Sequence, residues 1–192
     1  ERDTCKYTGG LRVGKSGLKM GARTACWGSA DCKQKVSSHS QFIGDIDEGM
    51  LYSTALNQAE IYSIYKRAYD SSSGSGGVTF IRAPSKVDLK KLPSGLVGFW
   101  PLDGDGKDIS DQKMSGTTVK PDWVAGVYNL AFRFDGNDAM VVPNHARLQV
   151  SRITMSAWIR PVEYDIKDHG DRGIIMNKEG ACESSVSRHP SL

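Results

Sequence analysis

The residues that decide the fold of this chain lie between Gly95 and Met176. They read GLVGFWPLDGDG over residues 95–106, GVYNLAFRFDGND over residues 126–138 and ITMSAWIRP over residues 153–161. Apolar and polar side chains alternate within these stretches, and a period of two is typical of half-buried β-strands. Asp-Gly and Gly-Asn pairs between them are typical of turns. Short strands at this spacing predict an all-β fold, a sandwich of two antiparallel sheets.

The alternation also predicts which side chains face the core. Trp100 and Trp158 fall within strands, and tryptophan in a strand usually packs in the core. We expect the apolar faces of the later strands to consist of Leu130, Phe132, Phe134, Ile153, Met155, Ala157 and Ile159.

Three motifs in these strands resemble a known family. They are VGFWPLD at residues 97–103, FDGND at 134–138 and SAWI at 156–159. In this order they resemble the first half of a laminin-G-like domain. The resemblance implies the concanavalin-A-like jelly-roll fold and a secreted, non-catalytic recognition module. It names no ligand.

A second match lies earlier in the chain. Residues 44–61 resemble the closing signature of the same family, which is a Gly-x-Ile-Asp-Glu strand, a Tyr, and then Ala-Leu-x-x-Ala-Glu-Ile. A short helix is predicted over residues 57–68, because Asn57 is a suitable N-cap and Glu60 completes a capping box. Apolar residues recur there at helical spacing, namely Leu56, Ile61, Ile64, Tyr65 and Ala68.

The chain therefore carries the end of a domain before the beginning of one. We assign residues 1–69 to the C-terminal part of one laminin-G-like unit and residues 95–180 to the N-terminal part of another. Residues 70–94 form a Ser/Gly-rich linker, and residues 181–192 form a polar tail. The linker favours a window cut across two tandem domains, and the alternative is one permuted, shortened domain. In either case the jelly roll is incomplete, and we expect the closing strand to dock onto the later segment.

Four cysteines, at positions 5, 26, 32 and 182, occur without a Cys-x-x-Cys pair or a histidine at zinc-ligand spacing. We favour a Cys26–Cys32 disulfide, which closes a short polar loop and agrees with a secreted protein. Cys5 and Cys182 are left unassigned, and free buried thiols are the alternative.

Composition excludes two classes of partner. The net charge is +3 and the basic residues form no stripe, so we expect no nucleic-acid partner. No apolar run approaches the ~18 residues of a membrane helix, so we expect no membrane segment. The chain starts at Glu1 without a signal region, which indicates a mature or excised piece.

The carboxylates Asp45, Asp47 and Glu48 suggest a glycosidase, because such enzymes use two carboxylates flanking the glycosidic bond. The third carboxylate expected after them is missing, since Gly49, Met50 and Leu51 follow. The closing signature of the family explains these residues without catalysis, so we expect no enzyme.

Two kinds of binding site are predicted. Asp135, Asn137 and Asp138 offer oxygen ligands for Ca²⁺ in one turn, although Asp and Asn also occur there simply because they favour tight turns. Trp27 and Trp123 lie in predicted loops and are our candidate ligand contacts.

The function expected from these observations is an extracellular recognition module that binds a glycan or a protein in adhesion or the matrix, with calcium as a candidate cofactor. The alternatives are a jelly-roll glycoside hydrolase or its accessory carbohydrate-binding module, and a structural spacer of a tandem array.

Overall fold

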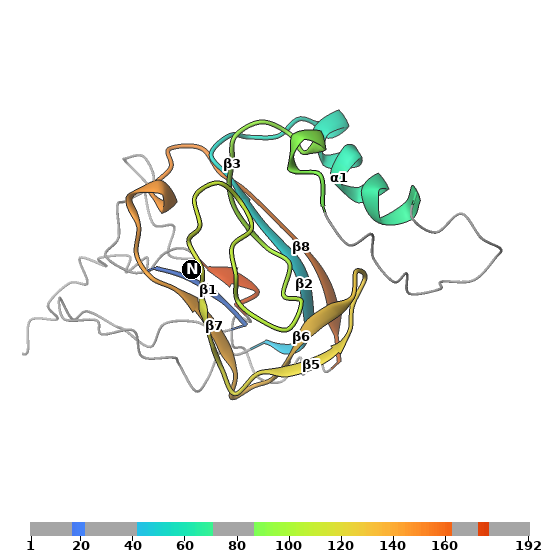
Figure 1. Ribbon diagram of the computed structural model, residues 1–192, viewed down its shortest axis with the longest axis vertical. Coiled ribbons are helices and arrows are strands. Elements are labelled where there is room, and N and C mark those ends of the chain that lie inside the picture. The colour runs from blue at the N-terminus through green and yellow to red at the C-terminus, as the bar shows by residue number, and fades with distance from the viewer. Residues whose placement is uncertain (1–16, 22–41, 71–86, 163–172, 177–192) are drawn as a thin grey trace, which may run out of the picture.

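The computed structural model describes residues 17–21, 42–70, 87–162 and 173–176, and this part of the chain forms two antiparallel sheets and one α-helix (Figure 1). The predicted all-β class is confirmed. The strands are β1 (Leu18–Met20), β2 (Ile43–Tyr52), β3 (Leu96–Trp100), β4 (Thr117–Val119), β5 (Asp122–Ala125), β6 (Leu130–Asp135), β7 (Ala139–Val142), β8 (Thr154–Pro161) and β9 (Ile175–Met176). The helix is α1 (Gln58–Asp70), with short 3₁₀ helices at η1 (Leu89–Lys91) and η2 (Ala146–Leu148).

Strand β2 is the centre of the larger sheet. Its whole length pairs with β8 on one edge. On the opposite edge, its first half pairs with β6 and its second half with β3, and β5 pairs with β6 beyond them. The smaller sheet has the order β4-β7-β1-β9.

This topology joins the two segments that the sequence assigns to separate units. Strand β2 belongs to the closing signature, whereas β3, β6 and β8 carry the opening motifs. The closing strand therefore docks onto the later segment, as expected, and the two segments share one sheet. The domain boundaries assigned from the sequence stay a prediction.

The main core lies between the two sheets, which Figure 1 shows as separate layers. Leu18 and Met140 of the smaller sheet belong to the same buried cluster as Ile46 and Phe132 of the larger one. Trp100 is fully buried there, as predicted, and its indole N–H donates to the carbonyl of Met114 at 2.9 Å. Both sheets thus bury their facing sides, which is the packing of a β-sandwich.

A bulge in β2 organises the opposite, outer face of the larger sheet. Glu48 has a φ of 55°, and the pairing with β8 shifts register between Asp47 and Met50. The bulge adds one residue to β2 at this point, so the side chains that face outward change from odd-numbered to even-numbered positions along the strand. Asp45 and Asp47 therefore point outward before the bulge, and Met50 and Tyr52 point outward after it. A second buried cluster forms where α1 covers this face, and it contains Met50, Tyr52, Ile64 and Phe99.

The start of α1 follows the predicted capping box. The backbone N–H of Asn57 donates to Oε2 of Glu60 at 2.8 Å, and the backbone N–H of Glu60 donates to Oδ1 of Asn57 at 3.1 Å. The expected apolar stripe is covered only in part. Ile64 is buried, whereas Ile61 and Tyr65 are 52% and 44% exposed.

Three positions on the predicted apolar faces are exposed, although the strand register keeps Met155 and Ile159 on the core side of β8, opposite Leu51 and Ile46. Leu130, Met155 and Ile159 are 36%, 38% and 43% exposed, and Ala131, assigned to the other face, is buried. Leu130 is the first residue of β6. Met155 and Ile159 lie on β8, and no strand among the described residues pairs with the outer edge of β8.

Several predictions fall on residues that the structure does not describe. They are the Cys26–Cys32 disulfide, the unassigned Cys5 and Cys182, and the ligand contact Trp27. In the part that is described, the helices are too short and too polar to cross a membrane.

We expect Ile46→Ala to lower the free energy of unfolding by about 2–5 kcal/mol, because it opens a cavity in a fully buried site. Ile46 sits directly between Phe132 of β6 and Ile159 of β8. Hydrogen exchange should therefore accelerate in β6 and β8 together. The same substitution at the exposed Ile61 should change stability by less than about 0.5 kcal/mol. Faster exchange confined to β2 would show that the strands do not form one cooperative sheet.

Candidate functional site

The outer face of the larger sheet carries a buried carboxylate between two arginines. Because of the strand register, Asp45 stands opposite Arg133 on one neighbour and Arg160 on the other. Its Oδ1 accepts a hydrogen bond from Nε of Arg133 at 2.9 Å, and its Oδ2 accepts one from Nε of Arg160 at 2.6 Å. The hydrogen bond to Asp45 raises the pKa of Arg133 above its ordinary value. Asp45 is therefore fully engaged, and the two guanidinium groups remain partly exposed beside it.

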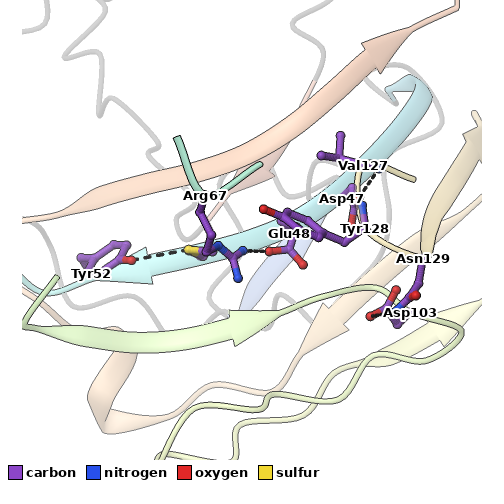
Figure 2. A network of polar contacts seen from close by, with 9 residues as sticks. Asp47, Glu48, Tyr52, Arg67, Asp103, Val127, Tyr128 and Asn129 are labelled. Atoms are coloured by element: carbon purple, nitrogen blue, oxygen red, sulfur yellow. Dashed lines mark hydrogen bonds and ion pairs between the residues drawn. The ribbon is translucent and has the colours of Figure 1, made fainter. Parts of the chain in front are cut away.

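Asp47, two residues along the same face, is buried without a cationic partner of this kind. Only 3% of the residue is exposed. Its Oδ2 accepts hydrogen bonds from the backbone N–H groups of Val127 at 2.7 Å and Tyr128 at 3.1 Å (Figure 2). Its Oδ1 is buried and has no hydrogen-bond partner among the described residues. Burial raises the pKa of Asp47 to about 7, and the two backbone hydrogen bonds oppose this shift.

A second carboxylate holds the same turn between β5 and β6. Oδ1 of Asp103 accepts from the backbone N–H of Leu130 at 3.0 Å, and Oδ2 accepts from the side-chain amide of Asn129 at 3.2 Å (Figure 2). Asn129 has a φ of 43°, which Asn tolerates better than most residues. A side chain at Gly126 would lie 2.6 Å from Oδ2 of Asp47, so the turn can approach Asp47 only with glycine there.

An ion pair ties α1 to the bulge of β2. Glu48 is buried and pairs with the guanidinium of Arg67 (Figure 2). That guanidinium also lies over the ring of Phe99 at 5.4 Å and the ring of Tyr128 at 4.8 Å. Burial lowers the pKa of Arg67 from its ordinary value. The last turns of α1 are thereby fixed over the outer face.

Two neighbouring hollows open on this face. A groove of about 260 Å³ runs between α1 and β8, and Tyr65 and Trp158 form part of its wall with ring centroids 5.5 Å apart. A smaller cavity of about 70 Å³ is lined by Asp45, Asp47 and Arg160, together with the turn at residues 125–127. Trp158 lines both hollows, so the aromatic groove and the charged cavity lie side by side with this ring as their common wall, and together they are the candidate site.

The predicted ligand contact Trp123 lies elsewhere, and its predicted position in a loop was wrong, because it pairs with Phe132 in the sheet. It is partly buried on the edge strand β5, where its ring centroid is 5.0 Å from that of Phe132 and it packs against the main core. Its role as a ligand contact stays a prediction.

The predicted calcium ligands form the turn between β6 and β7. Oδ1 of Asp135 accepts the backbone N–H of Asn137, and Oδ2 of Asp138 accepts the backbone N–H of Asp135, both at 2.7 Å. The hydrogen bond from the backbone N–H of Asn137 lowers the pKa of Asp135. Over the described ranges, no three acidic, His or Cys side chains gather in a group that could hold a metal. The turn thus uses its oxygens to fix its own backbone, and calcium stays a prediction.

Sequence reasoning missed Tyr65, Arg133 and Arg160, and it placed Trp158 in the core. One signal did exist for Trp158. It alternates with Thr154, Ser156 and Arg160, which is the polar side of β8, and a Trp on a polar face is a candidate contact. Nothing in the sequence showed that α1 would bring Tyr65 beside it.

The comparisons with known proteins identify no relative. No family model matches the chain, and no curated protein or solved structure is similar to it.

Asp47 should make the stability of the protein depend on pH. Its pKa in the folded state is about 7, above the ordinary value of 3.8, so the folded state binds the proton more tightly. This contribution is complete below pH 4 and is lost as the pH rises to 7, by at most about 1.4 kcal/mol per pH unit. We expect the stability of Asp47→Asn relative to the wild type to improve steadily between pH 4 and pH 7. Denaturant unfolding at several pH values measures this, and parallel curves for the two proteins would contradict it.

Proposed function

We propose that the chain is a non-catalytic, secreted recognition module of the jelly-roll type, which binds a glycan or an extracellular protein on the outer face of its larger sheet. The observation that carries the proposal is the position of Trp158, which joins an aromatic groove to a cavity lined by charged side chains. Binding sites commonly combine apolar and aromatic walls with a few convergent polar groups.

The surface around the groove supports this proposal. Tyr65 is 44% exposed and its ring lies beside that of Trp158, so both offer a partly open aromatic wall. Further large apolar side chains are exposed on the same two elements. Clustered apolar exposure of this kind marks interaction sites more often than scattered single residues do. These side chains are Ile61, Tyr62 and Met155.

The carboxylates of β2 favour binding over catalysis. Asp45 is engaged by two arginines and Glu48 by Arg67. Asp47 has a pKa of about 7, as a general acid requires. A glycosidase needs a second carboxylate as nucleophile or base, and the engaged Asp45 and Glu48 are poorly suited to that role.

Calcium remains part of the proposal as a candidate cofactor at Asp135, Asn137 and Asp138. Because both acidic side chains already cap the turn, an ion there would have to draw on their remaining oxygens. Binding measured with and without a chelator tests whether recognition depends on it.

We expect Trp158→Ala to weaken binding at least tenfold on an array of immobilised glycans and extracellular-matrix proteins, because it removes the wall common to both hollows. Trp123→Phe is the matched control and should bind as the wild type does, since that side chain packs against the core. Thermal unfolding verifies that both variants are folded. Loss of binding in Trp123→Phe alone would move the site to β5. A wild-type chain that binds nothing on the array would favour the structural spacer.

A further inference from the structure

We infer that the outer face recognises a neutral sugar, with a hydroxyl group of one hexose unit donating a hydrogen bond to the unpartnered Oδ1 of Asp47. This inference rests on the proposed recognition function and narrows its ligand to one chemical class. It follows from the polar groups of the small cavity, from the balance of charge around it and from the aromatic ring at its edge.

The first observation is the buried oxygen. Asp47 lines the cavity, 97% of its surface is buried, and Oδ1 has no hydrogen-bond partner in the described part of the chain. A buried polar atom left unsatisfied costs about 1–3 kcal/mol. Its partner Oδ2, by contrast, is held by two backbone N–H groups, so the carboxylate cannot turn away without losing them. Oδ1 is enclosed in the structure, so a donor that displaces the side chains around it meets a fixed acceptor once Asp47 is ionised, above its pKa of about 7.

The second observation is the charge around the cavity. Two carboxylates, Asp45 and Asp47, lie here beside two guanidinium groups, both of which pair with Asp45. Negative and positive side chains are therefore equal in number at this point. A ligand with an ammonium group would approach both arginines. A sulfated or carboxylated ligand would approach the buried Asp47. A neutral ligand that both donates and accepts hydrogen bonds avoids each of these conflicts.

The third observation is how the groups are arranged. Arg160 is about half exposed and contacts Asp45 through Nε and Nη2, and a guanidinium carries five N–H donors in all. A hydroxyl next to the one bound by Asp47 could accept from it. Trp158 lines the same cavity, so the apolar face of the sugar ring can lie against the indole. Adjacent hydroxyls on a ring with an apolar face are what a neutral hexose offers.

The size of the cavity agrees with partial entry of the ligand. Its volume is about 70 Å³, well below the roughly 300–1,000 Å³ of pockets that enclose a small molecule. It therefore admits a hydroxyl-bearing end, while the rest of the sugar lies over Trp158 and toward the groove along α1.

The test is binding of the full chain to immobilised neutral oligosaccharides with glucose, mannose or galactose ends, beside sialylated and sulfated glycans. The wild type should prefer the neutral set. Asp47→Asn replaces one oxygen by an N–H donor, and it should weaken binding to that set at least tenfold. A site that hydrogen-bonds a hydroxyl discriminates strongly once its acceptor is lost.

The matched control is Asp103→Asn. Asp103 holds the same turn as Asp47, through Leu130 and Asn129, but it does not line the cavity. This variant should bind neutral sugars within about twofold of the wild type, and an equal loss in both variants would show that Asp47 only positions the turn and would overturn the inference. The wild-type preference gives a second test that needs no variant. If the chain binds charged glycans or proteins but no neutral sugar, the inference fails and the recognition function stands. If it binds nothing, the recognition function itself fails.

Discussion

The structure depends on the pairing of β2 along both of its edges. Ten residues, Ile43–Tyr52, supply hydrogen bonds to three other strands, and all three come from the later part of the chain. Without β2, β8 would have no partner in the larger sheet, and β6 would lose its link to β3. Because the contacts join residues far apart in sequence, the larger sheet forms only when the two segments meet.

The same strand determines where chemistry can occur. Because side chains alternate along β2, Ile46 faces the core and Asp45 and Asp47 face outward. The bulge at Glu48 shifts this alternation by one residue, so that Tyr52 also faces outward. A carboxylate buried on a sheet face must find donors. Asp45 finds them on two arginines, whereas Asp47 finds backbone N–H groups for only one of its oxygens. This difference between two residues on one face separates a structural ion pair from a candidate binding group.

Helix α1 gives the outer face an aromatic groove beside the carboxylates. It covers one half of the face with Ile64 and is tied down by Arg67, yet it leaves Tyr65 half exposed beside Trp158. The groove exists because a narrow helix cannot cover a wide sheet completely. Its position next to the carboxylates lets one ligand meet an apolar wall and polar groups together.

The sequence by itself determined the all-β class, the strands that carry its motifs and the capping box of α1, because periodicity and turn chemistry are local properties. It also marked the carboxylates of β2. Only the tertiary structure decided that Asp45 lies between Arg133 and Arg160, that Asp47 keeps one oxygen unpartnered, and that Tyr65 stands beside Trp158. These relations depend on strand register and on where a helix packs. Register and packing are fixed by contacts between distant residues, so no local pattern records them.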